Sequence, residues 1–159
     1  MDTVTAAMSA PSTSSTSVVL SARVLFTTGE RIIVANRRGQ AWCTLPGGNV
    51  KPGERVEQAL HRKIRVETGL AVRTLDFVGC VEHSFVEAGR AWHELNMVFA
   101  STLSPFAEIA SREEAIDLGS LAVADLDAFE FRPAHLRTAI VNWLSTYRPG
   151  WYGPDGRTS

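Results

Sequence analysis

A glycine-rich loop that runs into a bounded amphipathic helix constrains this chain more than any other stretch. Two adjacent glycines, Gly47 and Gly48, permit backbone conformations that other residues avoid, and Pro52-Gly53 is a turn dipeptide. Apolar residues then recur at helical spacing, and Gly69 is a typical stop at a helix C-terminus. The sequence therefore predicts a loop, a helix and a stop, in that order.

The predicted helix changes character in its last turn. At about 100° per residue its apolar residues fall on one side. They are Val56, Ala59, Leu60 and Ile64. Lys63, Val66 and Glu67 continue this stripe, although an unpaired charge is costly to bury. We therefore expect the end of the helix to border a solvated cleft.

The whole stretch resembles the Nudix box, whose pattern is G-x5-E-x7-R-E-U-x-E-E-x-G-U, with U a bulky aliphatic residue. The matching fixed positions are Gly48, Glu54, Arg62, Ile64, Glu67, Gly69 and Leu70. Trp42 and the Leu45-Pro46-Gly47-Gly48 run are similar to the residues that precede the box in Nudix proteins. The resemblance implies an α/β fold: a Nudix-like α-β-α sandwich with a mixed sheet, the box loop and helix, and a C-terminal helix.

Two box positions depart from the family pattern. Lys63 stands where the family has the first glutamate after the arginine, and Val66 stands where it has the second-last glutamate. In the family these glutamates hold divalent metal ions on the substrate pyrophosphate, and the first can also act as a base. The two departures make this site more positive by three charges. Because the fold can persist without the charges that bind metal, a prediction of the fold is not by itself a prediction of activity.

The resemblance also implies candidate catalytic and metal-binding residues. Glu67 remains on the stripe where the family's metal ligands sit, and an ion pair with Lys63 is its alternative role. Carboxylates that replace the lost ones come from outside the box in many Nudix proteins. The candidates are Glu82, Glu94, Glu113 and Glu114. We assign catalysis and metal binding to Glu67 and Glu94, add the Gly48 carbonyl as a metal ligand, and expect Mg²⁺ or Mn²⁺.

Three basic residues are candidates for substrate binding. Lys63 carries three donors on a flexible stem and can bond a phosphate directly. Arg37 and Arg38 lie in a polar loop before the box, where they contact a phosphate or base or else simply face solvent. We assign a structural role to the remaining box residues Gly47, Glu54, Arg62 and Gly69.

Length and patterning predict one domain between two tails. A chain of 159 residues with 45% hydrophobic residues suits a single core. We expect a disordered Ser/Thr-rich tail over residues 1–16, the domain over 17–148 and an irregular tail over 149–159. The predicted elements are hairpins over 17–35 and 71–102, a short strand over 115–123 and a closing helix from Pro133.

The net charge and the cysteine content limit which partners the protein can bind and where in the cell we expect it. The net charge of −1 gives no general attraction to a nucleic acid polymer or an anionic membrane. Cys43 and Cys80 lack metal-ligand spacing and predict reduced thiols, and no apolar run has the roughly 20 residues that span a bilayer. Residues 1–16 have no basic residue or apolar core of a secretory signal, so we expect a cytoplasmic protein. A homodimer is a possible assembly.

These observations predict a pyrophosphohydrolase of the Nudix type. Its substrate is a small nucleoside diphosphate linked to another group, as in a nucleotide or nucleotide-sugar, and its metal site is weakened. The alternative is a catalytically inactive Nudix-fold module that binds a nucleotide or another phosphorylated ligand. A purely structural protein is disfavoured, because it has little use for so long a matching loop.

Overall fold

A seven-stranded mixed sheet forms the centre of the chain in the computed structural model, which describes residues 15–158. The strands are β1 (Ser17–Thr28), β2 (Arg31–Arg37), β3 (Gly47–Asn49), β4 (Asp76–Glu87), β5 (Arg90–Thr102), β6 (Ile116–Ala122) and β7 (Gly150–Tyr152). The helices are α1 (Val56–Thr68), the short 3₁₀ helix η1 (Val123–Ala128) and α2 (Leu136–Thr146).

The strand order brings the box loop to the middle of the sheet. The order is β6-β2-β1-β5-β4-β7, and β3 also pairs with β1. The long strand β1 pairs with β2 at its C-terminal end and with β3 through residues 21–23, while β5 runs parallel along its other edge. The loop that enters α1 is therefore anchored to a central strand.

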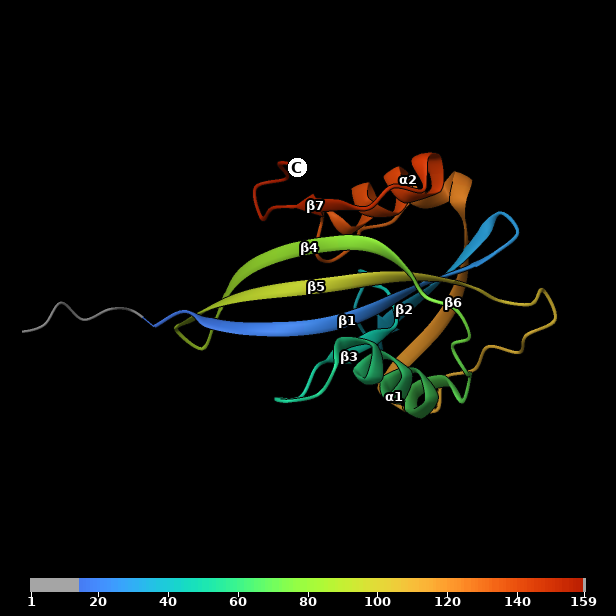
Figure 1. Ribbon diagram of the computed structural model, residues 1–159, viewed down its shortest axis with the longest axis horizontal. Helices are drawn as coiled ribbons and strands as arrows, with labels where there is room; N and C mark the ends of the chain where they lie inside the picture. The colour runs from blue at the N-terminus through green and yellow to red at the C-terminus, as the bar shows by residue number, and fades with distance from the viewer. Residues whose placement is uncertain (1–14, 159) are drawn as a thin grey trace, which may run out of the picture.

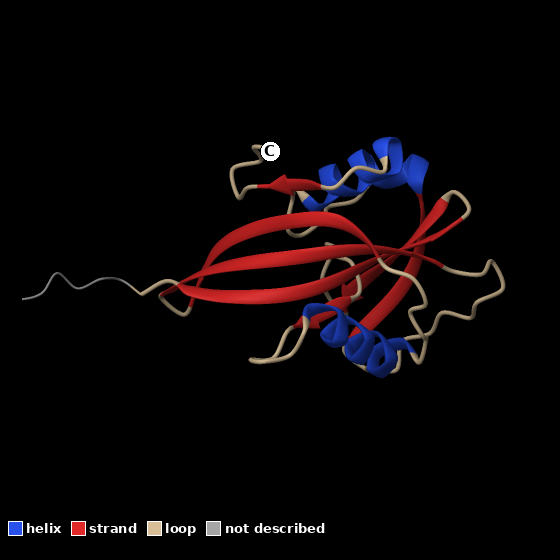
Figure 2. Cartoon of the chain, in the orientation of Figure 1, coloured by secondary structure: helices blue, strands red, loops and turns tan. Residues whose placement is uncertain are grey.

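The two α-helices cover opposite faces of the sheet (Figures 1 and 2). Leu60 and Ile64 of α1 pack in one core with Val24 and Phe26 of β1. The other core joins α2 to the opposite face of the same sheet, which includes Leu25. Successive side chains of a strand point to opposite faces, so β1 contributes to both cores. The predicted α-β-α sandwich with a mixed sheet is confirmed.

Helix α1 follows its sequence signals closely, with one difference. It ends at Gly69, whose φ of 71° is left-handed and whose N–H donates to the Arg65 carbonyl at 2.9 Å. Glu67 is only 2% exposed, although we expected this end of the helix to border a solvated cleft, and Val66 is 55% exposed. The apolar stripe therefore stops before the last turn, where the buried residues are the polar Glu67 and Thr68.

The predicted boundaries differ from the structure mainly toward the C-terminus. Residues 149–159, expected to be irregular, contain β7, which runs parallel to β4 and pairs Gly150 with Gly79. A Cβ on Gly79 would lie 2.0 Å from the Gly150 carbonyl oxygen, so this close pairing requires glycine. Of the tail predicted over 1–16, residues 1–14 lie outside the described residues.

Both cysteines lie in the core of the protein. Cys43 and Cys80 are buried free thiols. No helix within residues 15–158 combines the length and apolar character needed to cross a bilayer.

Candidate functional site

The box loop is held against β1 by a position that only glycine can occupy. Gly47 has a φ of 143°, and a Cβ there would lie 2.0 Å from the Ala22 carbonyl oxygen. At the other end of the loop, Arg62 donates to both carboxylate oxygens of Glu54, from Nε and Nη2, at 2.9 Å each. Its Nη2 also donates to the Asn49 carbonyl at 3.3 Å. These bonds fix the loop relative to α1.

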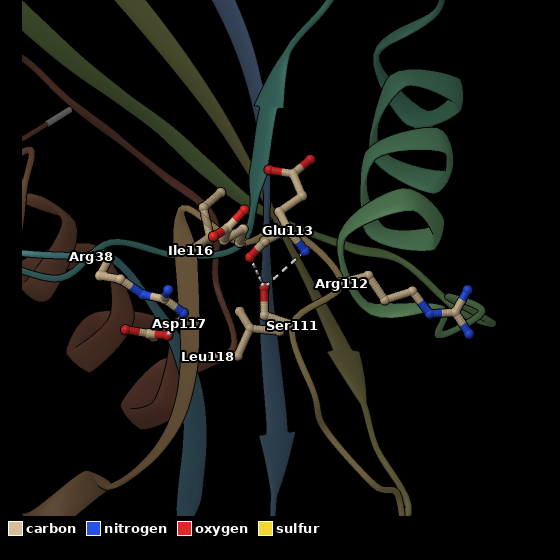
Figure 3. A pocket seen from close by; sticks show the side chains of 8 residues that line it. Arg38, Ser111, Arg112, Glu113, Ile116, Asp117 and Leu118 are labelled. Atoms are coloured by element: carbon tan, nitrogen blue, oxygen red, sulfur yellow. Dashed lines mark hydrogen bonds and ion pairs between the residues drawn. The ribbon is translucent and has the colours of Figure 1, made fainter.

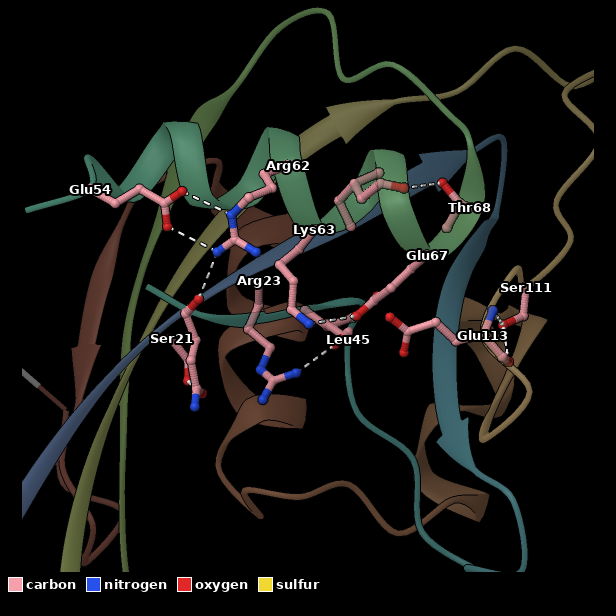
Figure 4. A network of polar contacts seen from close by, with 12 residues as sticks. Ser21, Arg23, Leu45, Glu54, Arg62, Lys63, Glu67, Thr68, Ser111 and Glu113 are labelled. Atoms are coloured by element: carbon pink, nitrogen blue, oxygen red, sulfur yellow. Dashed lines mark hydrogen bonds and ion pairs between the residues drawn. The ribbon is translucent and has the colours of Figure 1, made fainter. Parts of the chain in front are cut away.

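Lys63 and Glu67 lie together beside this loop (Figure 4). They are one helical turn apart, and Nζ of Lys63 is 3.7 Å from Oε1 of Glu67. The Lys63 side chain is 28% exposed and that of Glu67 only 2%. Lys63 is therefore the direct neighbour of the Glu67 carboxylate.

The Glu67 carboxylate has a mixed electrostatic environment. Burial raises its pKa, while Lys63 lowers it. The charge of Glu113 raises the pKa further, and Arg23 and a hydrogen bond from the Gly47 backbone lower it. The Glu67 and Glu113 carboxylates face one another in Figure 4. Of the candidate acids outside the box, Glu113 is thus the one whose charge acts on Glu67.

Glu94 belongs to a second polar cluster, next to Arg23. Its Oε1 accepts a hydrogen bond from Ser21 Oγ at 2.8 Å and lies 3.6 Å from Nη2 of Arg23. Arg23 also donates to Asn96 Oδ1 at 3.0 Å and to the Leu45 carbonyl at 3.1 Å. Because the Arg23 charge acts on both Glu94 and Glu67, this guanidinium links the two carboxylates.

Sequence reasoning missed Arg23 as a site residue. The signal was present in the alternation along β1, where polar Ser21 and Arg23 are flanked by the buried apolar residues Ala22 and Val24. A period of two places both polar residues on one face of the strand. Only the pairing of β1 with β5 shows that this face holds Glu94.

The second hairpin brings together Glu82 and His93. His93 Nε2 lies 2.8 Å from Glu82 Oε1, and Nδ1 lies 3.0 Å from Ser84 Oγ. The other carboxylate oxygen of Glu82 accepts a hydrogen bond from Trp151 Nε1 at 2.8 Å. Because adjacent residues alternate between faces, Glu82 points away from the side of the sheet that carries Glu94.

Arg37 and Arg38, which were predicted to bind substrate, are not part of the Lys63 and Glu67 pair. Arg38 forms an exposed ion pair with Asp117 at 3.4 Å, and Arg37 is exposed at the end of β2. Arg38 also lines a pocket of about 390 Å³ (Figure 3). The other lining residues are Ser111, Arg112, Glu113, Glu114, Ile116, Asp117 and Leu118. Through Glu113 this pocket adjoins the Lys63 and Glu67 site.

The carboxylates and carbonyl predicted to hold a metal ion do not fit one in this arrangement. Glu67 and Glu94 each face a protein cation, and the stem of Lys63 lies against Gly48. Within residues 15–158, no group of three or more His, Cys, Asp or Glu side chains is placed to hold a metal. The Mg²⁺ or Mn²⁺ role of Gly48, Glu67 and Glu94 thus stays a prediction.

The sandwich and the box loop with its helix define the class of protein. The sequence profile of the NUDIX domain matches residues 18–140. The chain therefore belongs to the Nudix hydrolase family, whose members are typically pyrophosphohydrolases and usually use a divalent metal.

Similar proteins agree with this placement. A Mycobacterium tuberculosis protein described as mutator protein MutT4 is 36% identical over 59 residues, which are 37% of this chain and 24% of that protein. The crystal structure of a MutT NUDIX hydrolase from Burkholderia pseudomallei has 26% identity and a TM-score of 0.57, covering 69% of this chain and 84% of that one. The NUDIX domain of Shewanella oneidensis NrtR, solved with ADP ribose, has 14% identity and a TM-score of 0.61, with coverage of 82% and 89%.

Proposed function

We propose that the protein is a pyrophosphohydrolase that cleaves a nucleoside diphosphate linked to another group, such as a nucleotide or nucleotide-sugar. The carrying observation is the 3.7 Å pair of Lys63 and Glu67 beside the box loop. A lysine ammonium binds phosphate oxygens well, and a carboxylate beside it can receive a proton. ADP-ribose, which the related NrtR domain binds, is a compound of this class.

The proposed reaction uses Glu67 as the general base. A water oxygen attacks one phosphorus atom, and the bond from that phosphorus to the bridging oxygen breaks. The water proton goes to Glu67, and the bridging oxygen leaves as the anion of the second phosphate group, with Lys63 offsetting its charge. Burial raises the pKa of Glu67, and a carboxylate with a raised pKa is a better base at neutral pH.

Binding without hydrolysis is the second candidate function. The Glu67 side chain is only 2% exposed and already pairs with Lys63. Such a carboxylate is hard for an attacking water to reach. The chain is then an inactive Nudix-fold module that holds a nucleotide or another phosphorylated ligand.

Product analysis separates the two candidates. The full-length protein is incubated with ADP-ribose, ADP and UDP-glucose, with and without Mg²⁺, and nucleoside monophosphate is measured by mass spectrometry. We expect the unaltered protein to release nucleoside monophosphate. Glu67→Gln should lower the rate of this release by about 100-fold or more. Glu57→Gln, which alters an exposed glutamate of the same helix, should not lower it. Binding of these compounds without monophosphate release favours the second candidate, and neither binding nor release rejects both.

A further inference from the structure

The stem of Lys63 fills the space that Gly48 leaves open. A Cβ added to Gly48 would lie 2.3 Å from Cε of Lys63 and 3.2 Å from its Nζ. The ammonium ends 3.7 Å from Oε1 of Glu67. Lys63 thus places a positive charge between the box loop and the last turn of α1.

Protein cations already balance the carboxylates around this position. Lys63 pairs with Glu67, and Arg23 lies 3.6 Å from Glu94 while its charge also acts on Glu67. A divalent cation brought to Glu67 meets repulsion from both basic side chains. Two positive groups that face one small region are instead suited to an anion.

The Lys63 ammonium keeps hydrogen-bonding capacity for a ligand. Its distance of 3.7 Å from Glu67 is that of an ion pair and is longer than a hydrogen bond. An ammonium has three N–H donors, and the Lys63 side chain is 28% exposed. A phosphate oxygen can therefore reach it without displacing Glu67 from its buried position.

We propose that Lys63 takes the place of a divalent metal ion, binding the diphosphate oxygens directly so that ligand binding requires no metal. This inference rests on the ligand class proposed above but not on turnover. This accounts for Lys63 at a position where the Nudix box pattern has a glutamate. The positive charge that a metal ion bound to carboxylates would supply comes instead from the lysine ammonium.

Lysine NMR tests the contact directly, because Lys63 is one of only two lysines in the chain. The full-length protein is labelled on lysine and titrated with inorganic pyrophosphate, and separately with ADP, in the presence of EDTA. We expect the Cε and Nζ signals of Lys63 to shift with saturation. Those of Lys51, which is exposed in the box loop, serve as the internal control and should stay in place.

Calorimetry with matched variants tests the metal requirement. Pyrophosphate should bind the unaltered protein in EDTA and in Mg²⁺ with dissociation constants within about threefold of each other. Lys63→Met should weaken binding in EDTA by about tenfold or more, whereas Lys51→Met should not. Lys63→Met/Glu67→Gln, which leaves no unpaired buried carboxylate, shows the same loss if the single variant folds poorly. Lys63→Glu should bind only when Mg²⁺ is present.

Each other outcome overturns the inference. Binding of pyrophosphate only with Mg²⁺, binding in EDTA that survives both Lys63 variants, or no binding at all contradicts a metal-replacing lysine. Failure of the proposed hydrolysis is a separate result, because it appears as absent monophosphate even when pyrophosphate binds in EDTA.

Discussion

Arg62 holds both carboxylate oxygens of Glu54 at 2.9 Å, across the eight residues that separate the box loop from the middle of α1. Hydrogen bonds, first from Arg62 and then from the Lys51 backbone N–H, lower the pKa of Glu54 from 4.5 to about 2. Because the pKa is depressed in the folded chain, the stabilisation is complete above pH 4.5 and is lost as the pH falls toward about 2. The loop is therefore tied to the helix in a pH-dependent way.

This pair predicts part of the acid sensitivity of the fold. Glu54→Gln should lower stability near neutral pH and flatten its decline between pH 4.5 and about 2, measured by urea unfolding at a series of pH values. Glu57→Gln, at an exposed first-turn position, is the matched control and should keep the original decline. An unchanged pH profile in Glu54→Gln contradicts the assignment.

The two box glycines should respond differently to alanine. Gly47→Ala places a Cβ 2.0 Å from a backbone oxygen at a φ of 143°, so it should cost roughly 2–4 kcal/mol of unfolding free energy. Gly48→Ala meets only the flexible stem of Lys63 and should cost about 1 kcal/mol or less. Denaturant unfolding compares them, and equal losses argue against this difference.

Gly48→Ala should also displace Lys63, and thereby weaken pyrophosphate binding while the fold persists. The double variant Gly48→Ala/Lys63→Ala removes the crowding, so its stability should return toward that of Lys63→Ala alone. Calorimetry and unfolding of the two single variants and the double variant measure this coupling. If the loss of stability in the double variant equals the sum of the losses in the two single variants, Gly48 and Lys63 are not in contact.

The loop and α1 could be predicted because their signals are local, whereas the α-β-α sandwich was predicted from the resemblance of that stretch to the Nudix box. Glycines, a turn dipeptide and helical periodicity each act over a few residues, and the structure has α1 end at Gly69 as its sequence indicates. Strand β7 was not predicted, because its three residues become a strand only by pairing with β4. Its glycine suggests a loop in isolation, and the close approach of β7 depends on Gly79 of β4, where a Cβ would lie 2.0 Å from the Gly150 carbonyl oxygen.

The candidate site was less predictable because its contacts cross the sheet. Glu67 and Lys63 are one turn apart, so their pairing follows from helical geometry. The partnership of Arg23 with Glu94 depends on the parallel register of β1 and β5, which no local pattern encodes. For that reason the sequence suggested Glu94 as a metal ligand without revealing the cation beside it.

Arg23 should be important for stability as well as for the site. Arg23→Met removes the hydrogen bonds to Asn96 and Leu45 and leaves Glu94 without its cation, so we expect a loss of about 1–3 kcal/mol in unfolding free energy. Arg157→Met breaks the Asp155 ion pair, in which the arginine side chain is 90% exposed, and should change stability by no more than about 0.5 kcal/mol. Comparable losses in the two variants count against a buried role for Arg23.

Trp151 anchors β7 to the second hairpin through one hydrogen bond to Glu82, at 2.8 Å. This bond is the largest cause of the lowered pKa of Glu82, followed by the hydrogen bond with His93. Trp151→Phe keeps most of the aromatic ring area but removes the donor, so the pKa of Glu82 should rise, and unfolding free energy should fall by about 1 kcal/mol. Carboxyl NMR titration measures the first effect and urea unfolding the second. Trp42→Phe, which removes an exposed hydrogen bond to Gln40, should leave the Glu82 titration unchanged. A Glu82 pKa that does not move in Trp151→Phe contradicts the hydrogen bond between Trp151 and Glu82.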